Sequence, residues 1–145
     1  MADALHTGLW AVLFTDLVDS TALLARVGDE AGASIRQALE QIEVRSINRH
    51  DGILVKGTGD GVMAAFTSVV DAIEAAVDIQ QRVRRRNHSS EFATDLRIGI
   101  SVGEVEHDEG DLFGLTVNEA ARLCAVADGG EIVISDLVRT LAGSR

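Results

Sequence analysis

Residues 9–21 read LWAVLFTDLVDST, a stretch that changes from an apolar run into a polar turn and then into a helical pattern. The run Leu9–Thr15 is short, continuous and apolar, which is typical of a strand buried on both faces. It delivers Asp16 to its carboxyl end. Ligands of α/β proteins collect at such strand ends, and the following helix offers backbone N–H groups at the positive end of its dipole. The stretch therefore predicts the first strand of a sheet and a site for an anionic ligand.

The rest of the chain alternates strand and helix patterns. The turn 56–61 is too short for a crossover, so we expect the apolar runs on either side of it to form an antiparallel hairpin. The spacing of Thr116 and Glu119 is that of a capping box and predicts a helix start. The expected order is strand 9–15, one long helix from 20 to 50, hairpin strands 53–55 and 62–66, helix 68–86, loop 87–95, strand 96–105, acidic loop 107–111, a helix from 116, strand 132–134 and a short helix capped by Ser135. This order predicts an α/β sandwich of the ferredoxin-like split βαβ plan, with one mixed or antiparallel sheet and packed helices.

Composition limits the classes of function. With 145 residues, 46% of them hydrophobic, we expect one domain spanning residues 1–145. A net charge of −10 argues against a general affinity for nucleic acid, and we interpret the basic run Arg82–Arg86 as a solvated helix end. No apolar run approaches the ~20 residues that cross a bilayer, and no secretory signal is present. Cys124 has no intrachain partner and is expected to be a small buried residue, so we expect a cytoplasmic protein without membrane insertion.

Two aspartates are candidate metal ligands. An acidic residue beside a phosphate site makes sense if a cation lies between them, and Mg²⁺ and Mn²⁺ bind carboxylate and phosphate oxygens together, so Asp16 is the first candidate. Asp60 lies at the tip of the glycine-rich turn 57–61. If the hairpin lies next to the first strand, the two carboxylates could bridge two metal ions about 3.5–4 Å apart. Taken singly, Asp16 and Asp19 could be helix N-caps, and Asp60 part of an ordinary Asp-Gly turn.

A pair of polar residues shares one face of the helix expected from residue 116. Asn118 and Arg122 are four residues apart and project the same way. Arginine matches the geometry of phosphate, and an amide can hold a ribose oxygen or stabilise a developing charge. As an isolated pair they would more often be ordinary helix surface. Lys56, the one lysine in the sequence, stands four residues before Asp60.

Three segments of the chain, FTDLVDST (14–21), VKGTGDG (55–61) and DLFGLTVNEAAR (111–122), together resemble the class III adenylyl and guanylyl cyclase family. They occur in the family's order and at its spacing, and GISVGEV (99–105) is similar to its central strand. The resemblance covers essentially the whole chain. It implies an adenylate cyclase that converts ATP to 3′,5′-cyclic AMP and pyrophosphate, with two Mg²⁺ or Mn²⁺ ions in each active site.

The resemblance also implies roles for the residues at the end of the first strand. Asp16 and Asp60 would bind the metal ions, and Leu17 would add a backbone carbonyl. The residues implied to contact the triphosphate are Val18, Asp19, Ser20 and Thr21.

The remaining implied roles concern the base and the transition state. Lys56 and Asp111 would select adenine, because this pair satisfies the N1 acceptor and the N6 donor. Asn118 and Arg122 would orient the ribose and stabilise charge on the α-phosphate. In the family the metal aspartates come from one subunit and these four residues from the other. Since this chain carries both sets, a symmetric homodimer with shared active sites is implied.

Two features depart from the family pattern, and other functions stay open. Position 19, commonly glycine, is Asp19, which adds negative charge near the triphosphate. The chain ends at Arg145, before the final hairpin in which family members usually carry a lysine for the terminal phosphate. The alternatives are a guanylate cyclase, a catalytically weak or silent nucleotide-binding dimerisation module, and a metal-dependent phosphatase. Such a phosphatase would use Asp16 as nucleophile and would usually need a second aspartate where Val18 stands.

Overall fold

Six strands and five helices follow one another along residues 5–143, the part of the chain that the computed structural model describes. The strands are β1 (Gly8–Leu17), β2 (Ile53–Gly57), β3 (Val62–Phe66), β4 (Leu96–Asp108), β5 (Asp111–Phe113) and β6 (Ile132–Ile134). The helices are α1 (Ser20–Val27), α2 (Asp29–Arg49), α3 (Val69–Ser89), α4 (Leu115–Val126) and α5 (Asp136–Ala142).

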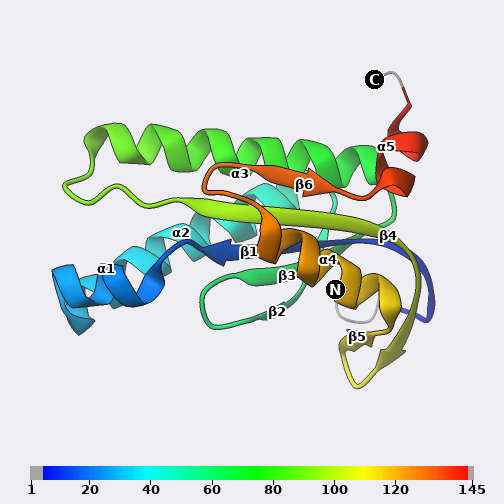
Figure 1. Ribbon diagram of the computed structural model, residues 1–145. Helices are drawn as coiled ribbons and strands as arrows, with labels where there is room; N and C mark the ends of the chain where they lie inside the picture. Colours follow the sequence, from blue (N-terminus) through cyan, green and yellow to red (C-terminus); the bar gives the residue numbers. More distant parts are fainter. Residues whose placement is uncertain (1–4, 144–145) are drawn as a thin grey trace.

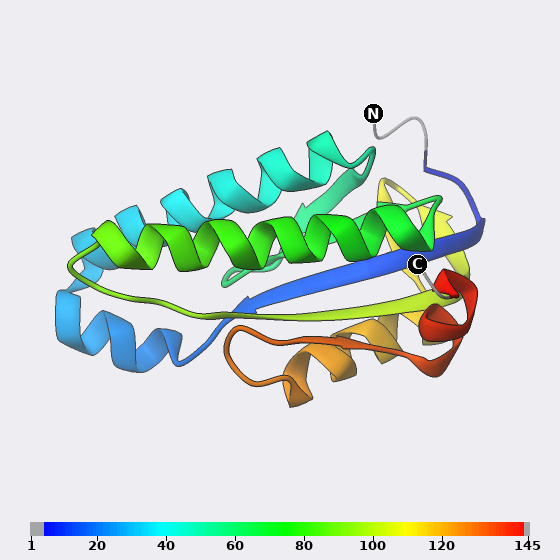
Figure 2. The same ribbon diagram turned by 90° about the horizontal axis from the view of Figure 1, so that it is seen from above.

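All six strands form one mixed sheet with β1 near its centre. The order is β2-β3-β1-β4-β5, with antiparallel neighbours, and β6 pairs with β4 in parallel. The predicted hairpin of β2 and β3 is confirmed, and β3 is the strand that lies beside β1. Helices α2 and α3 cover one face of the sheet, and α4 packs on the other (Figures 1 and 2). The ferredoxin-like plan expected from the sequence is therefore confirmed.

The sheet buries apolar side chains on both faces because each face meets a helical layer. Leu13, Phe66 and Ile98 belong to the larger cluster under α2 and α3. On the other face α4 comes so near to β4 that a Cβ at Gly99 would lie 2.3 Å from the backbone nitrogen of Cys124. Cys124 is 4% exposed, which confirms its interpretation as a small buried residue, and this burial raises the pKa of its thiol to about 12.

The helix predicted from residue 20 to residue 50 is interrupted. Gly28 has φ 86° and ψ 168°, so α1 ends and α2 begins around it. The glycine follows a helical pattern that continues on both sides, and the spacing of apolar residues alone could not show the break. Ser68 and Ser135 cap α3 and α5 as expected, each accepting a hydrogen bond from a backbone amide three residues on.

Two predictions around residues 107–119 were wrong. The acidic loop predicted over residues 107–111 is only a tight turn: β4 continues to Asp108, Glu109 and Gly110 take positive φ, and β5 starts at Asp111 and pairs back along β4. The capping box is absent: Gly114 is the N-cap of α4, and the Thr116 hydroxyl donates to the Glu104 carbonyl at 3.0 Å. Within the described residues no helix is long and apolar enough to cross a bilayer.

A buried polar contact joins α2, β1 and β3 next to Asp16 in the sequence, at Thr15. Glu43 of α2 is 2% exposed and accepts a hydrogen bond from the Thr15 hydroxyl. The same hydroxyl accepts a hydrogen bond from the Val62 amide at 2.9 Å. Burial raises the pKa of the Glu43 carboxyl to about 7, against its ordinary value of 4.5. Helix α2 is thus tied to β1 and β3 through a carboxyl that favours its neutral form.

We predict that this carboxyl makes stability depend on pH. Because the pKa of Glu43 is raised on folding, its contribution is fully present below about pH 4.5 and is lost as the pH rises through about 7. The loss has an upper bound on the order of 3 kcal/mol. Glu43→Gln keeps the shape and cannot ionise, so urea unfolding from pH 5 to 8 should show a flatter stability profile than the wild type. Parallel profiles of the two proteins would contradict this role.

Candidate active site

The turn between β2 and β3 lies against the carboxyl end of β1. The Asp60 carbonyl accepts a hydrogen bond from the Leu17 amide at 3.0 Å, and the Asp60 carboxylate accepts one from the Ser20 hydroxyl at 2.8 Å. A Cβ at Gly61 would lie 2.0 Å from the Thr15 carbonyl oxygen, so a side chain at this position would push the turn away. The structure thus places Asp60 beside the segment that carries Asp16, as the sequence predicted.

Each of these aspartates has an arginine neighbour. The Asp16 Oδ2 atom accepts hydrogen bonds from Arg97 Nε at 3.1 Å and Nη2 at 2.7 Å. Arg36 Nη1 lies 3.7 Å from Asp60 Oδ1. The side chains of Asp16 and Asp60 are 33% and 35% exposed, so both remain open to solvent. Neither arginine is predicted by the sequence pattern. Asp16 and Arg97 are paired across β1 and β4, so Arg97 could have been found only if the register of these two strands were known.

The oxygen donors at this end of β1 suit a hard divalent cation. Carboxylates are the ligands that Mg²⁺ and Mn²⁺ prefer, and Mg²⁺ usually keeps some ligands from water or phosphate. Among residues 5–143 no group of three or more His, Cys, Asp or Glu side chains is placed to hold a metal ion. Two carboxylates therefore fit a metal only if a bound molecule or water completes its coordination.

The segment from Val18 to Thr21 leads into α1. The Val18 amide donates to the Asp95 carbonyl at 2.9 Å, so it is engaged within the protein. Asp19 has φ 54°, a left-handed conformation that favours glycine, and it occupies the N-cap position without a side-chain hydrogen bond. Ser20 and Thr21 form the first turn of the helix. The N-cap alternative for Asp16 is wrong, because Asp16 lies inside β1.

The residues expected to select the base lie together. Lys56 on β2 and Asp111 on β5 are 55 positions apart, yet Lys56 Nζ donates to Asp111 Oδ2 at 2.8 Å. Partial burial alone would raise the pKa of the Asp111 carboxyl, but hydrogen bonds from Lys56 and from the Leu112 amide outweigh it and hold the pKa below its usual value. The pair presents one donor and one acceptor group that are both still accessible.

Asn118 and Arg122 form a separate group on α4. Both side chains are exposed. Within the described residues no hydrogen bond or ion pair joins either of them to Asp16, Asp60 or the Lys56–Asp111 pair. Apolar side chains stand beside them: Phe113 is 48%, Leu115 82% and Val126 70% exposed.

The chain is similar to known proteins over nearly its whole length. Residues 5–143 match the family model described as the adenylate and guanylate cyclase catalytic domain. A putative adenylate cyclase 3 of Rhizobium meliloti is 33% identical over 136 residues, which cover 92% of this chain and 23% of that protein. An adenylate cyclase of Streptomyces coelicolor is 33% identical over 135 residues, which cover 90% of this chain and 34% of that protein.

Solved structures agree on the fold. The crystal structure of an adenylate/guanylate cyclase/hydrolase from Silicibacter pomeroyi has a TM-score of 0.82 at 30% identity, covering 97% of this chain and 83% of the other. The adenylyl cyclase CyaB from P. aeruginosa has a TM-score of 0.80 at 22% identity, covering 94% and 81%. The chain spans about a quarter to a third of the length of the two curated relatives named above. Its sequence and its structure place it in the adenylate and guanylate cyclase catalytic domain family.

Proposed function

We propose that this domain is an adenylate cyclase that converts ATP to 3′,5′-cyclic AMP and pyrophosphate at sites shared by two copies of the chain. The observation that carries the choice of ATP is the 2.8 Å contact between Lys56 and Asp111. An ammonium donor suits N1 of adenine and a carboxylate acceptor suits its N6 amino group, whereas guanine presents a donor at N1 and an acceptor at O6. The relatives from R. meliloti and S. coelicolor, both named adenylate cyclases, support the same choice.

Asp16 and Asp60 would hold two Mg²⁺ or Mn²⁺ ions, together with the Leu17 carbonyl. When bound, such ions lower the pKa of an attacking hydroxyl and neutralise a triphosphate. The residues at the start of α1, Val18 to Thr21, would contact the triphosphate through the turn and through the positive end of the helix. Arg97, bound to Asp16, adds a permanent cation at the same place. This arginine offers phosphate a partner in a chain with one lysine.

Asn118 and Arg122 would act on the transition state. The ribose 3′-oxygen attacks the α-phosphorus and loses its proton, while the bond from that phosphorus to the pyrophosphate oxygen breaks. Arg122 would stabilise the negative charge that grows on the α-phosphate, and Asn118 would hold the ribose in line. The protein would accelerate the reaction mainly by positioning the ribose and by stabilising negative charge on the phosphate, without forming a covalent intermediate.

A second copy of the chain would bring its Asn118 and Arg122 to the metal aspartates, which these two residues do not contact within one copy. Asn118 and Arg122 are exposed on α4 and make no contact with the metal aspartates. Phe113, Leu115 and Val126 give the same surface an apolar character. A two-fold arrangement would bury this surface and bring α4 of one copy to the β1 end of the other, twice. The unpaired thiol of Cys124 suits a reducing compartment, so we propose that the reaction takes place in the cytoplasm.

The catalytic proposal is tested by cyclic AMP formation from ATP with Mg²⁺ or Mn²⁺. Asp16→Asn and Asp60→Asn remove a charge without changing shape, and each should lower kcat at least about 100-fold. Asp136→Asn, at a fully exposed position of α5, is the matched control and should leave the rate unchanged. Equal, negligible turnover in the wild type and both site variants would favour a silent nucleotide-binding module.

The choice of base is tested by exchanging the pair on β2 and β5. Lys56→Glu combined with Asp111→Gly should shift the ratio of kcat/KM from ATP towards GTP, because the carboxylate then accepts from guanine N1. The two rates are measured on the same preparation with both nucleotides. A wild type that prefers GTP, or a double variant that keeps the ATP preference, would refute the assignment.

The shared site is tested by mixing inactive variants. In a random mixture of Asp16→Asn and Arg122→Ala chains, half of the dimers are mixed and each has one intact site, so about one quarter of the wild-type activity should return. Asp16→Asn mixed with Asp60→Asn should stay inactive, since both changes lie in the same half of the site. Failure of the first mixture to recover activity, in a dimer shown to exchange subunits, would exclude sharing.

A further inference from the structure

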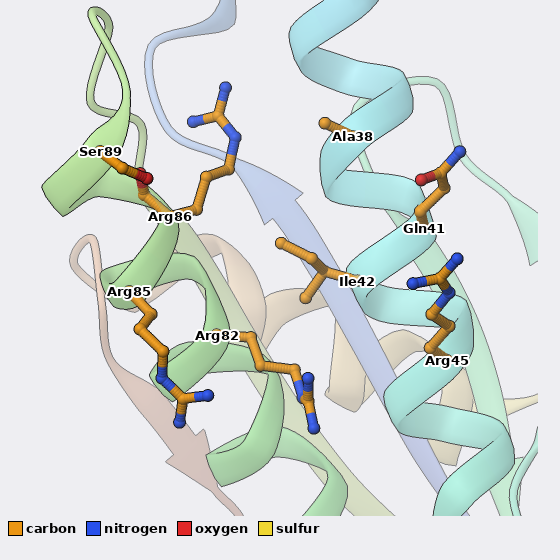
Figure 3. Close-up of a pocket in the computed structure, with 8 residues that line it drawn as sticks. All are labelled: Ala38, Gln41, Ile42, Arg45, Arg82, Arg85, Arg86 and Ser89. Carbon is orange, nitrogen blue, oxygen red and sulfur yellow. The ribbon is translucent and has the colours of Figure 1, made fainter.

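A groove of about 400 Å³ lies between α2 and α3, away from the candidate active site (Figure 3). Eight residues line it: Ala38, Gln41, Ile42, Arg45, Arg82, Arg85, Arg86 and Ser89. None of them belongs to the buried core, so the groove opens on the outer side of the two helices. The sheet separates it from α4, on which Asn118 and Arg122 stand.

Positive charge is concentrated around this groove in an otherwise acidic chain. The chain has a net charge of −10, yet six of its twelve arginines stand in the C-terminal halves of α2 and α3: Arg45, Arg49, Arg82, Arg84, Arg85 and Arg86. Asp78 offsets part of this charge, because its carboxylate accepts from Arg49 at 2.7 Å and from Arg82 at 2.8 Å. The remaining guanidinium groups keep a local excess of positive charge.

The arginines of the groove differ in the number of hydrogen bonds and ion pairs that they make with other residues of the chain. Arg82 is paired with Asp78, and Arg86 donates to the Phe92 carbonyl at 3.4 Å. Within the described residues, Arg45 and Arg85 make no hydrogen bond and no ion pair. Figure 3 shows Ile42 and Arg45 on α2 and Arg82 and Arg86 on the facing part of α3, with the Arg85 side chain farther from α2 and its guanidinium directed away from Ile42. The groove therefore has unused donors at its edges, Arg45 on one helix and Arg85 on the other, beside the apolar side chain of Ile42.

We propose that this groove is a binding site for a small anion that carries two or more phosphate groups. Guanidinium groups match phosphate oxygens in a bidentate geometry, and several of them on two helices can contact successive phosphates. Its volume is in the range of small-molecule sites. The apolar floor at Ile42 can receive the organic part of a ligand such as a nucleoside triphosphate, whereas inorganic triphosphate would use the arginines alone.

Occupation of the groove would join α2 to α3, because Arg45 comes from one helix and Arg85 from the other. The sequence pattern led us to interpret Arg82–Arg86 as a solvated helix end. In the structure Arg45 of α2 lines the same groove as the basic run of α3, so the groove has arginines on both helices. The proposal does not depend on cyclase activity, since none of the groove residues belongs to the proposed active site.

The test is calorimetric titration of the whole chain with sodium triphosphate and, separately, with ATP, in EDTA at low salt. The wild type should show saturable binding, and Arg45→Gln combined with Arg85→Gln should weaken it at least about tenfold. These two arginines support no other residue in the described structure, so the double variant should fold. Tighter binding of ATP than of triphosphate would assign a role to the apolar floor, and equal affinities would assign binding to the phosphates alone.

Two controls separate this site from general attraction and from the active site. Arg84→Gln combined with Arg139→Gln removes the same charge from exposed positions outside the groove, and it should change the affinity less than about twofold. Arg122→Ala, which disables the proposed active site, should also retain binding. No saturable binding by the wild type, an equal loss in both double variants, or a loss in Arg122→Ala would overturn the proposal.

Discussion

The turn between β2 and β3 can approach β1 only because residue 61 has no side chain. A Cβ there would meet the Thr15 carbonyl at 2.0 Å, and the approach brings the Asp60 carbonyl to the Leu17 amide. On the same side of β1, the Thr15 hydroxyl links the Val62 amide to the buried carboxyl of Glu43. The backbone segments that carry Asp16 and Asp60 are therefore held together by packing and hydrogen bonds within the chain.

Features that depend on neighbours in sequence could be predicted. The apolar run of β1, the short glycine-rich turn and the serine caps of α3 and α5 each follow from local chemistry, and the structure contains them. The Lys56–Asp111 contact joins residues 55 positions apart, and it was expected only through a family resemblance that covers both segments. Without that resemblance, neither residue alone distinguishes a base-binding site from ordinary surface.

Features that depend on strand register or on long-range packing could not be predicted. Arg97 meets Asp16 because β1 and β4 pair over ten residues, a fact that no local spacing contains. The helix expected from residue 20 to residue 50 breaks at Gly28, where φ is 86°, and the break could not be predicted because the apolar period continues on both sides of it. Glu119 accepts a hydrogen bond from Ser101 of the neighbouring strand β4, so tertiary contact overrides the capping box that its position favoured.

The distribution of charge is compatible with the polyanion binding proposed above for an acidic chain. A net charge of −10 repels a triphosphate at long range, but salt screens that repulsion beyond about 8–10 Å, so the nearest groups decide binding. Near the end of β1 those groups include Arg97 and Arg36, which offset Asp16 and Asp60. These two ion pairs offset the charges of Asp16 and Asp60, while Asp19 keeps a negative charge beside Arg97. A divalent ion bound as proposed would have to compete with Arg97 for the Asp16 carboxylate, and phosphate oxygens would help it by adding ligands to the ion and partners to the arginine. Metal and triphosphate are therefore expected to favour each other's binding at this end of the sheet.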